Sequence, residues 1–211
     1  MRHEVFFNVV ADYNWNIKHI PYQKRPKTLP EILSKQEIQS LLSVITDPKH
    51  LAIVSILYGC GLRVSECLNL KLEDIDSANM VLIVRNGKGN KDRVTILSPK
   101  LLGILRSYYR SCKVKPVSYL FPMRFDPHKT FSKRQVELFV SEAGKKAGIV
   151  KRVYPHILRH SFATHLLDSG VPLHKVQRIL GHGSLRSTSI YIHLAKDFLK
   201  EVTSPLDNME A

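Results

Sequence analysis

Apolar residues recur at helical spacing along most of this chain. Ser34 and Glu37 have the spacing of a capping box, and the apolar positions after them predict a helix. Residues 51–57 are almost entirely apolar, so the helix predicted over residues 48–58 should be buried, with Gly59 and Gly61 ending it. The same reasoning predicts further helices over residues 63–70, 98–112, 132–148, 156–169, 172–181 and 184–194.

Two segments have the pattern of strands instead. Residues 80–85 and 93–97 are rich in β-branched side chains at alternating positions. The polar segment between them contains Gly87 and Gly89, which adopt positive φ readily and so favour a hairpin turn. The predicted fold class is therefore mainly α with a small antiparallel β-sheet or hairpin.

Composition divides the chain into four parts. Residues 1–24 carry apolar and aromatic side chains but are too short to fold alone, and a linker containing proline and lysine follows over residues 25–33. We expect the main domain over residues 34–195 and an amphipathic C-terminal segment over residues 196–211.

No apolar run approaches the roughly 20 residues of a membrane span. The N-terminus lacks the pattern of a signal peptide, and the 3 cysteines show no C-x-x-C spacing, which indicates reduced thiols. These features predict a cytoplasmic protein with no membrane partner.

Charge narrows the class of partner. The 32 Lys and Arg against 18 Asp and Glu give a net charge of +14, and the basic residues cluster along the chain. A polyanion is therefore the expected partner, and nucleic acid is favoured over a membrane because no basic amphipathic helix with bulky apolar anchors stands out.

Two residues at the start of the predicted helix 156–169 could bind a phosphate. His156 and Arg159 are three positions apart, so they share one helix face. An arginine fork binds two phosphate oxygens, and a histidine beside it can donate or accept a proton near neutral pH. The pair alone is also compatible with an ordinary polar helix surface.

Basic residues elsewhere could complete such a site. Arg63 follows a glycine turn, and it is either a second phosphate clamp oriented by Glu66 or only the ion-pair partner of Glu66. Lys88 lies at the hairpin tip, where a lysine held in a DNA groove could act as a general acid. Nearby or clustered basic residues are candidates for DNA contacts: Arg85, Lys91, Arg93, Lys145, Lys146 and Arg152.

A metal site is disfavoured. His156 and His160 have ligand-like spacing, but the chain has neither H-E-x-x-H nor a cysteine pair, and Arg159 between them would repel a cation. Clustered carboxylates for a two-metal nuclease are not apparent either. No cofactor is expected.

Taken together, these residues suit phosphoryl transfer to a tyrosine. Two arginines would stabilise the charge of the transition state, Tyr191 would be the nucleophile, and His156, Lys88 and His182 would handle protons. Each residue alone has an ordinary structural reading, helix capping for His182 and half-buried packing for Tyr191 among them.

Several segments closely resemble the tyrosine recombinases of the phage integrase family, especially the Xer-like branch. They are GCGLRVSECLNL, NGKGNKDR, HILRHSFATHLLDSG, ILGHGS and STSIYIH. The resemblance covers about residues 33–208 and implies a catalytic set formed by Arg63, Lys88, His156, Arg159, His182 and Tyr191.

The resemblance also implies an architecture. It implies a catalytic domain that clamps double-stranded DNA, preceded by a core-binding domain of which residues 1–24 look like the last helix. Family members usually act as homo-tetramers on paired DNA sites, and residues 196–211 look like the segment that docks on a neighbouring subunit. The outcome would be integration, excision, inversion or dimer resolution.

Two other functions stay open from the sequence. A DNA-binding or regulatory partner would bind DNA without cleaving it, and a type IB topoisomerase shares the tyrosine chemistry but relaxes DNA without recombining it.

Overall fold

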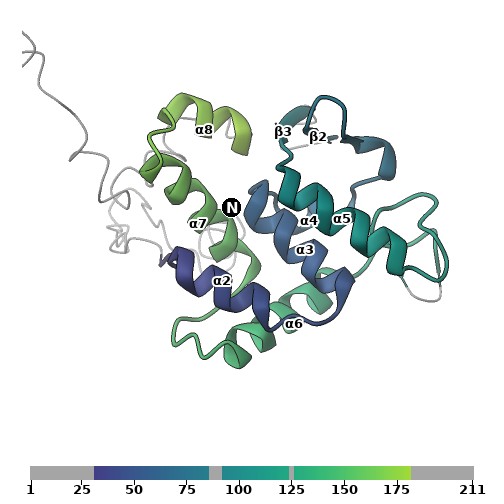
Figure 1. Cartoon of the computed structure of the whole chain (residues 1–211), viewed down its shortest axis with the longest axis horizontal. Helices are drawn as coiled ribbons and strands as arrows, with labels where there is room; N and C mark the ends of the chain where they lie inside the picture. Colours follow the sequence, from purple (N-terminus) through teal and green to yellow (C-terminus); the bar gives the residue numbers. More distant parts are fainter. Residues whose placement is uncertain (1–30, 86–91, 124–125, 182–211) are drawn as a thin grey trace, which may run out of the picture.

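The computed structural model describes residues 31–85, 92–123 and 126–181. The expectations for residues 1–24, most of the linker, the hairpin tip, the helix over 184–194 and the C-terminal segment lie outside the described residues. The described elements in chain order are α2 (Lys35–Ser43), α3 (Pro48–Gly59), α4 (Val64–Leu68), the 3-10 helix η3 (Leu72–Asp74), β1 (Ile75–Asp76), β2 (Val81–Val84), β3 (Arg93–Ile96), α5 (Pro99–Ser111), α6 (Lys133–Lys146), α7 (Pro155–Asp168) and α8 (Leu173–Leu180) (Figure 1).

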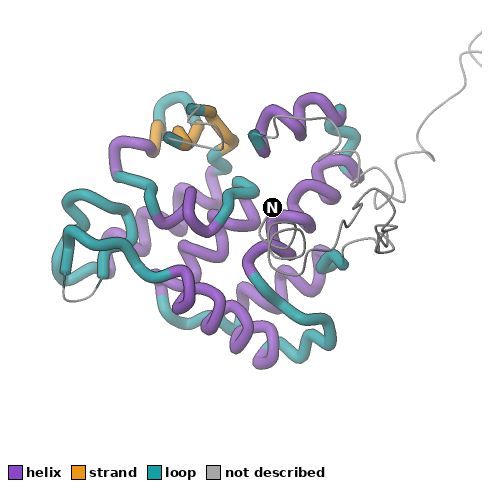
Figure 2. The backbone as a smooth tube through the Cα atoms, turned by 180° about the vertical axis from the view of Figure 1, so that it is seen from behind, coloured by secondary structure: helices purple, strands orange, loops and turns teal. Residues whose placement is uncertain are grey.

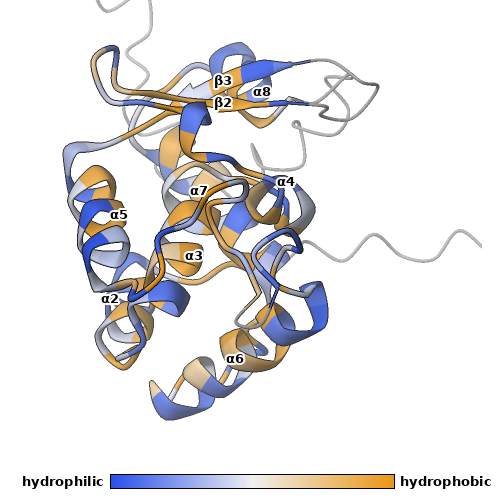
Figure 3. Cartoon of the chain, turned by 90° about the vertical axis from the view of Figure 1, so that its right-hand side faces the viewer, coloured by the Kyte–Doolittle hydropathy of each residue, from blue (hydrophilic) through white to orange (hydrophobic). Residues whose placement is uncertain are grey.

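Helix α3 lies at the centre of the fold. Its residues 52–57 are buried, as the apolar run predicted, and it packs against α2, α4, α5, α6 and α7. Figure 3 shows the ribbon of α3 in hydrophobic colours among helices that carry both hydrophobic and hydrophilic residues. Asp47 caps the helix by accepting from the amide of His50, and Pro48 occupies the first turn, where its missing N–H costs nothing.

Helices α2, α5 and α6 also begin with a side-chain cap. Ser34 accepts from the amide of Glu37 while the Glu37 carboxylate accepts from the amide of Ser34, so the predicted capping box is confirmed. Ser98 and Ser132 cap α5 and α6 through their hydroxyls. The predicted helices over 156–169 and 172–181 are confirmed as α7 and α8, within a residue or so at each end.

The sheet has three antiparallel strands in the order β1-β2-β3. The hairpin prediction is confirmed for β2 and β3, whereas the short strand β1 was not predicted. Val81 pairs with Ile96 and Ile83 with Val94 on the outward face of the sheet. Leu82 and its partner Thr95 are buried and face the core. All three strands lie at one end of the molecule, near α8 (Figure 2).

The start of the described chain is anchored in the core. Leu33, which falls inside the expected linker, is fully buried, and its amide donates to the Ser161 hydroxyl of α7 at 2.8 Å. Lys151 stabilises the same segment by donating hydrogen bonds to the Ile32 carbonyl and to the Glu37 carboxylate. Residues 31–33 are therefore part of the folded domain.

A smaller cluster joins α7 to α8. Phe162 and Leu167 of α7 pack with Val176 and Leu180 of α8, apart from the main core. Because α8 is amphipathic and short, this cluster and its polar contacts determine where its C-terminal end lies. No helix among the described residues is long and apolar enough to cross a membrane.

Gly61 is required where α3 turns into α4. Its φ is +63°, and a Cβ would lie 2.3 Å from Cδ1 of Phe162. Gly61→Ala should lower the free energy of unfolding by about 2–4 kcal/mol, since it combines a left-handed backbone penalty with overpacking. Urea denaturation measures this.

Gly148 provides the matched control for Gly61. Its φ is +68°, but nothing lies within 4 Å of the position of its Cβ. Gly148→Ala should therefore cost only the backbone term of about 1–2 kcal/mol. Equal losses in the two variants would show that contact with Phe162 does not matter.

Candidate active site

Arg63 lies at the start of α4, immediately after the glycine turn. Its backbone is extended at the N-cap position, and its amide donates to Oε2 of Glu66 at 2.8 Å. Its guanidinium donates from Nη1 to Oε1 of the same carboxylate at 2.7 Å, and the side chain keeps 25% of its surface exposed. The turn therefore leaves one side of the Arg63 fork accessible to a ligand.

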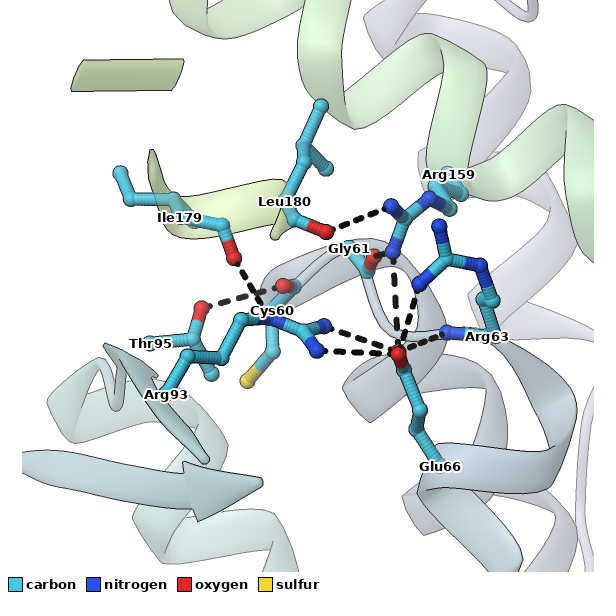
Figure 4. A network of polar contacts seen from close by, with 9 residues as sticks. All are labelled: Cys60, Gly61, Arg63, Glu66, Arg93, Thr95, Arg159, Ile179 and Leu180. Carbon is cyan, nitrogen blue, oxygen red and sulfur yellow. Dashed lines mark hydrogen bonds and ion pairs between the residues drawn. The ribbon is translucent and has the colours of Figure 1, made fainter. Parts of the chain in front are cut away.

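Glu66 is the centre of a network of three arginines (Figure 4). Its side chain is only 7% exposed. Arg93 donates to both carboxylate oxygens at 2.9 and 2.8 Å, Arg63 donates to one, and Arg159 lies 3.7 Å away. One buried carboxylate therefore faces three guanidinium groups, which leaves a net positive charge at this point.

The electrostatics of Glu66 follow from these contacts. Burial alone would raise its pKa, but hydrogen bonds from Arg93 and from the Arg63 amide, with the charge of Arg93, outweigh burial and lower the pKa from 4.5 to about 2. Glu66 is therefore ionised at any pH near neutrality and holds the arginines in place.

Arg159 is more buried than the sequence indicated. Its side chain is 3% exposed and donates to the carbonyls of Gly61 and Leu180, the latter at 2.7 Å. The sequence placed Arg159 on one exposed face with His156, but only His156 of the two is exposed. Arg159 instead links α7 to the glycine turn and to the end of α8, directly behind Arg63 (Figure 4).

Arg63 and His156 line the same surface cavity. It has a volume of about 670 Å³, and Lys133, Arg152 and Tyr154 also line it. Two carboxylates, those of Glu31 and Glu137, lie in its wall as well. The cavity is large enough for a nucleic-acid backbone and carries more positive than negative groups.

His156 is suited to proton transfer at this cavity. Burial, with the charges of Arg159 and Arg63, lowers its pKa below 6.5, so the ring is neutral at neutral pH. The ring of His160 lies 6.2 Å away between centroids, and burial, His156 and Arg159 lower the pKa of His160 to about 4. A neutral His156 can accept a proton from a nucleophile, whereas His160 does not line the cavity.

The other predicted DNA contacts differ in their exposure and in their partners. Arg152 lines the cavity, and Lys145 and Lys146 lie exposed in the last turn of α6. Arg85 is 47% exposed and donates to Asp74 at 2.6 Å. Arg93 is a correction to the surface role expected for it: it is 10% exposed and turned inward to Glu66, so its guanidinium is not presented to a phosphate.

Four predicted site residues lie outside the described residues. They are Lys88, Lys91, His182 and Tyr191. The described residues on either side are Arg85 and Asp92 for the hairpin, and Gly181 for the segment after α8.

Sequence reasoning missed Lys133 and the inward role of Arg93. Lys133 begins α6 directly after the Ser132 cap, where a lysine reads as a solvated surface residue, so no signal marked it. Arg93 did carry a signal, because it alternates with Thr95 on the buried face of β3. The basic hairpin beside it favoured the surface interpretation instead.

Within residues 31–85, 92–123 and 126–181, no group of three or more His, Cys, Asp or Glu side chains is arranged to hold a metal ion. The positive charge of Arg159 acts on both His156 and His160.

The fold and the site together define a mainly helical domain with a small antiparallel sheet and a cationic site suited to a backbone phosphate. The chain belongs to the phage integrase family, which it matches over residues 31–197. The resemblance noted in the sequence is thereby confirmed.

Named proteins that are similar to this chain support the same family. The chain is 40% identical over 203 residues to the putative integrase/recombinase y4eF of Sinorhizobium fredii, covering 96% of this chain and 80% of that protein. It is 42% identical over 190 residues to the tyrosine recombinase XerA of Pyrococcus furiosus, covering 89% of this chain and 65% of XerA. The chain thus spans about two thirds of the length of XerA.

Solved structures show the same fold. A crystal structure of XerA recombinase superposes with a TM-score of 0.73 at 36% identity, covering 94% of this chain and 70% of that one. XerH site-specific recombinase bound to its palindromic difH substrate, after cleavage, gives a TM-score of 0.76 at 27% identity, covering 92% and 59%. The predicted tyrosine recombinase catalytic-domain fold is confirmed.

Proposed function

We propose that this chain is the catalytic part of a site-specific DNA recombinase, a tyrosine-type DNA strand transferase that cleaves and rejoins strands through a 3′-phosphotyrosyl intermediate. The observation that carries the proposal is that Arg63 and His156 line one cavity, while Glu66 joins Arg63 to the buried Arg159. Homology to proteins named as tyrosine recombinases supports the reaction type.

The proposed reaction balances without an external energy source. The Tyr191 oxygen attacks the phosphorus, a phosphotyrosyl bond forms, and the bond from phosphorus to the 5′-oxygen breaks. Arg63 and Arg159 stabilise the charge that develops on the phosphate. His156 accepts the tyrosine proton, and Lys88, aided by His182, supplies the proton that the 5′-oxygen takes.

The charge network explains why the site can be built before DNA arrives. Glu66 holds Arg63 so that one side of its guanidinium faces the cavity, and preorganised donors cost little reorganisation during reaction. Arg159, although buried, adds positive charge directly behind Arg63. A phosphate beside Arg63 would also favour protonation of His156, as proton transfer requires.

The wider assembly forms part of the same proposal. Double-stranded DNA is the partner, two DNA sites are paired by a homo-tetramer, and residues 196–211 dock on a neighbouring subunit. Residues 1–24 belong to a core-binding domain, and the catalytic domain expected over residues 34–195 also includes residues 31–33, which the sequence had assigned to the linker of residues 25–33. The net charge of +14 and the related XerH complex with difH support DNA binding. The proposed location is the cytoplasm.

A suicide substrate tests the reaction directly. A nicked duplex that loses a short strand after cleavage should trap the chain as a covalent DNA adduct that survives denaturing electrophoresis. Peptide mapping by mass spectrometry should place the nucleotide on Tyr191. Salt-dependent DNA binding without an adduct on the cognate site would instead identify a regulatory DNA-binding protein, and relaxation of plasmid DNA without strand exchange would identify a topoisomerase.

A further inference from the structure

Arg93 joins three separate segments of the chain through one guanidinium group. It is the first residue of β3, and its Nη1 and Nη2 atoms donate to the two oxygens of Glu66 in α4. Its Nε donates to the carbonyl of Ile179 in α8 at 3.0 Å. A side chain that is only 10% exposed therefore connects β3, α4 and α8 (Figure 4).

The end of α8 is shaped around the stem of Arg93. Gly181 ends α8 with a φ of +65°, and a Cβ there would lie 2.7 Å from Cδ of Arg93. The glycine thus permits the left-handed turn and also the close approach of the arginine. Any residue larger than glycine at position 181 would displace either α8 or the Arg93 side chain.

The same strand is bound to the turn that precedes Arg63. The Thr95 hydroxyl donates to the Cys60 carbonyl at 3.1 Å, and the Cys60 thiol donates to the Ile96 carbonyl at 3.1 Å. Because Thr95 and Cys60 are buried, these bonds hold β3 at a fixed distance from the glycine turn. Arg93 extends this attachment to the end of the strand that is next to the hairpin.

Neutralising Glu66 does not require Arg93. Arg63 already forms an ion pair with Glu66 at 2.7 Å, and Arg159 adds a second cation at 3.7 Å. Burying a third arginine carries a desolvation penalty that its attraction to one carboxylate does not readily offset. The geometry of its three bonds, which fixes segments relative to one another, accounts better for its placement.

We propose that Arg93 is a positioning residue for strand transfer, which locks the base of the hairpin containing Lys88 to α4 and to the end of α8. The role rests on the proposed function, in which Lys88 protonates the departing 5′-oxygen. Arg93 does not touch the DNA in this role. It acts by fixing the position of β3, the strand that follows Lys88 in the sequence, relative to Arg63 and Arg159.

The experiment compares two leaving groups. Arg93→Met and Arg93→Lys are tested at saturating DNA in single-turnover reactions, with Arg110→Met, at an exposed arginine in the last turn of α5, as the control. One suicide duplex has the normal 5′-oxygen at the scissile phosphate, and the other has sulfur in its place. A thiolate leaves without a proton, so its departure does not need Lys88. DNA affinity, its salt dependence and thermal unfolding are measured in parallel.

Arg93→Met should slow adduct formation about 100-fold on the oxygen duplex, since a misplaced general acid loses its contribution. The deficit should nearly disappear on the sulfur duplex, and DNA affinity should not change. Arg93→Lys keeps a charge beside Glu66, so it should fold like the unmodified chain and show a smaller deficit with the same rescue. Arg110→Met should react at the unmodified rate on both duplexes.

Three results for Arg93→Met would overturn this role alone. The first is an unchanged rate on the oxygen duplex, and the second is an equal deficit on both duplexes, which would indicate a merely structural effect. The third is a lower DNA affinity with a reduced salt slope, which would indicate a phosphate contact. An unmodified chain that forms no adduct on either duplex would overturn the proposed function itself, and this role with it.

Discussion

Tyr191→Phe should abolish the covalent DNA adduct while leaving DNA affinity intact. The substitution removes the only atom that can form the phosphotyrosyl bond and retains the ring, so binding energy from packing is kept. Denaturing electrophoresis of a labelled suicide duplex measures the adduct, and a filter or fluorescence assay measures the affinity. This is the largest effect expected, because a phenylalanine ring has no oxygen that can attack phosphorus.

Tyr109→Phe is the matched control for Tyr191→Phe. Tyr109 lies on α5, is 37% exposed and lies beneath the Lys115 ammonium group, 5.0 Å from its ring centroid. It should form the adduct at the unmodified rate. If an adduct persists at another residue in Tyr191→Phe, the assignment of the nucleophile is wrong even though the reaction type stands.

Glu66→Gln should cause the largest loss of stability of any substitution in the network. It removes the buried anion that faces Arg63, Arg93 and Arg159, and it leaves two of these guanidinium groups buried without a counter-charge. Breaking a buried ion pair from one side costs about 3–5 kcal/mol. Urea denaturation at neutral pH measures the change in the free energy of unfolding.

Glu37→Gln is the corresponding control outside the network. Glu37 is 26% exposed, accepts from Lys151 and completes the capping box of α2. A partly exposed pair with a capping role should cost only about 1 kcal/mol. Similar losses for the two glutamates would show that the three arginines do not depend on Glu66.

The same carboxylate determines how stability depends on pH. The folded pKa of Glu66 is about 2, below its ordinary value of 4.5, so its stabilising contribution is complete above pH 4.5 and is lost as the pH falls from 4.5 towards 2. Glu66→Gln has no such group, so its stability should fall less steeply with pH over this window. An equally steep fall would assign the acid sensitivity to other carboxylates.

Local patterns predicted the elements that depend on nearby residues. The capping box at Ser34, the start of α3 at Pro48 and the end of α8 next to Gly181 each depend on residues within one turn of chain, and each lies where the sequence predicted it, within a residue. Strand β1 escaped prediction because two residues carry no period, and its pairing with β2 exists only in the folded sheet.

The sequence by itself identified the family and the mainly helical fold, and it predicted that Arg63, His156 and Arg159 share a site, since short-range spacing and residue type carry that information. Only the tertiary structure showed that Arg159 is buried, that Arg93 points inward to Glu66 and that Lys133 shares the cavity of Arg63. The physical reason is that whether a charge faces water or a buried partner depends on residues far away in the chain. Alternation with Thr95 indicates the inward face of β3 for Arg93, but its partners Glu66 and Ile179 are distant in sequence, and no local pattern could name them.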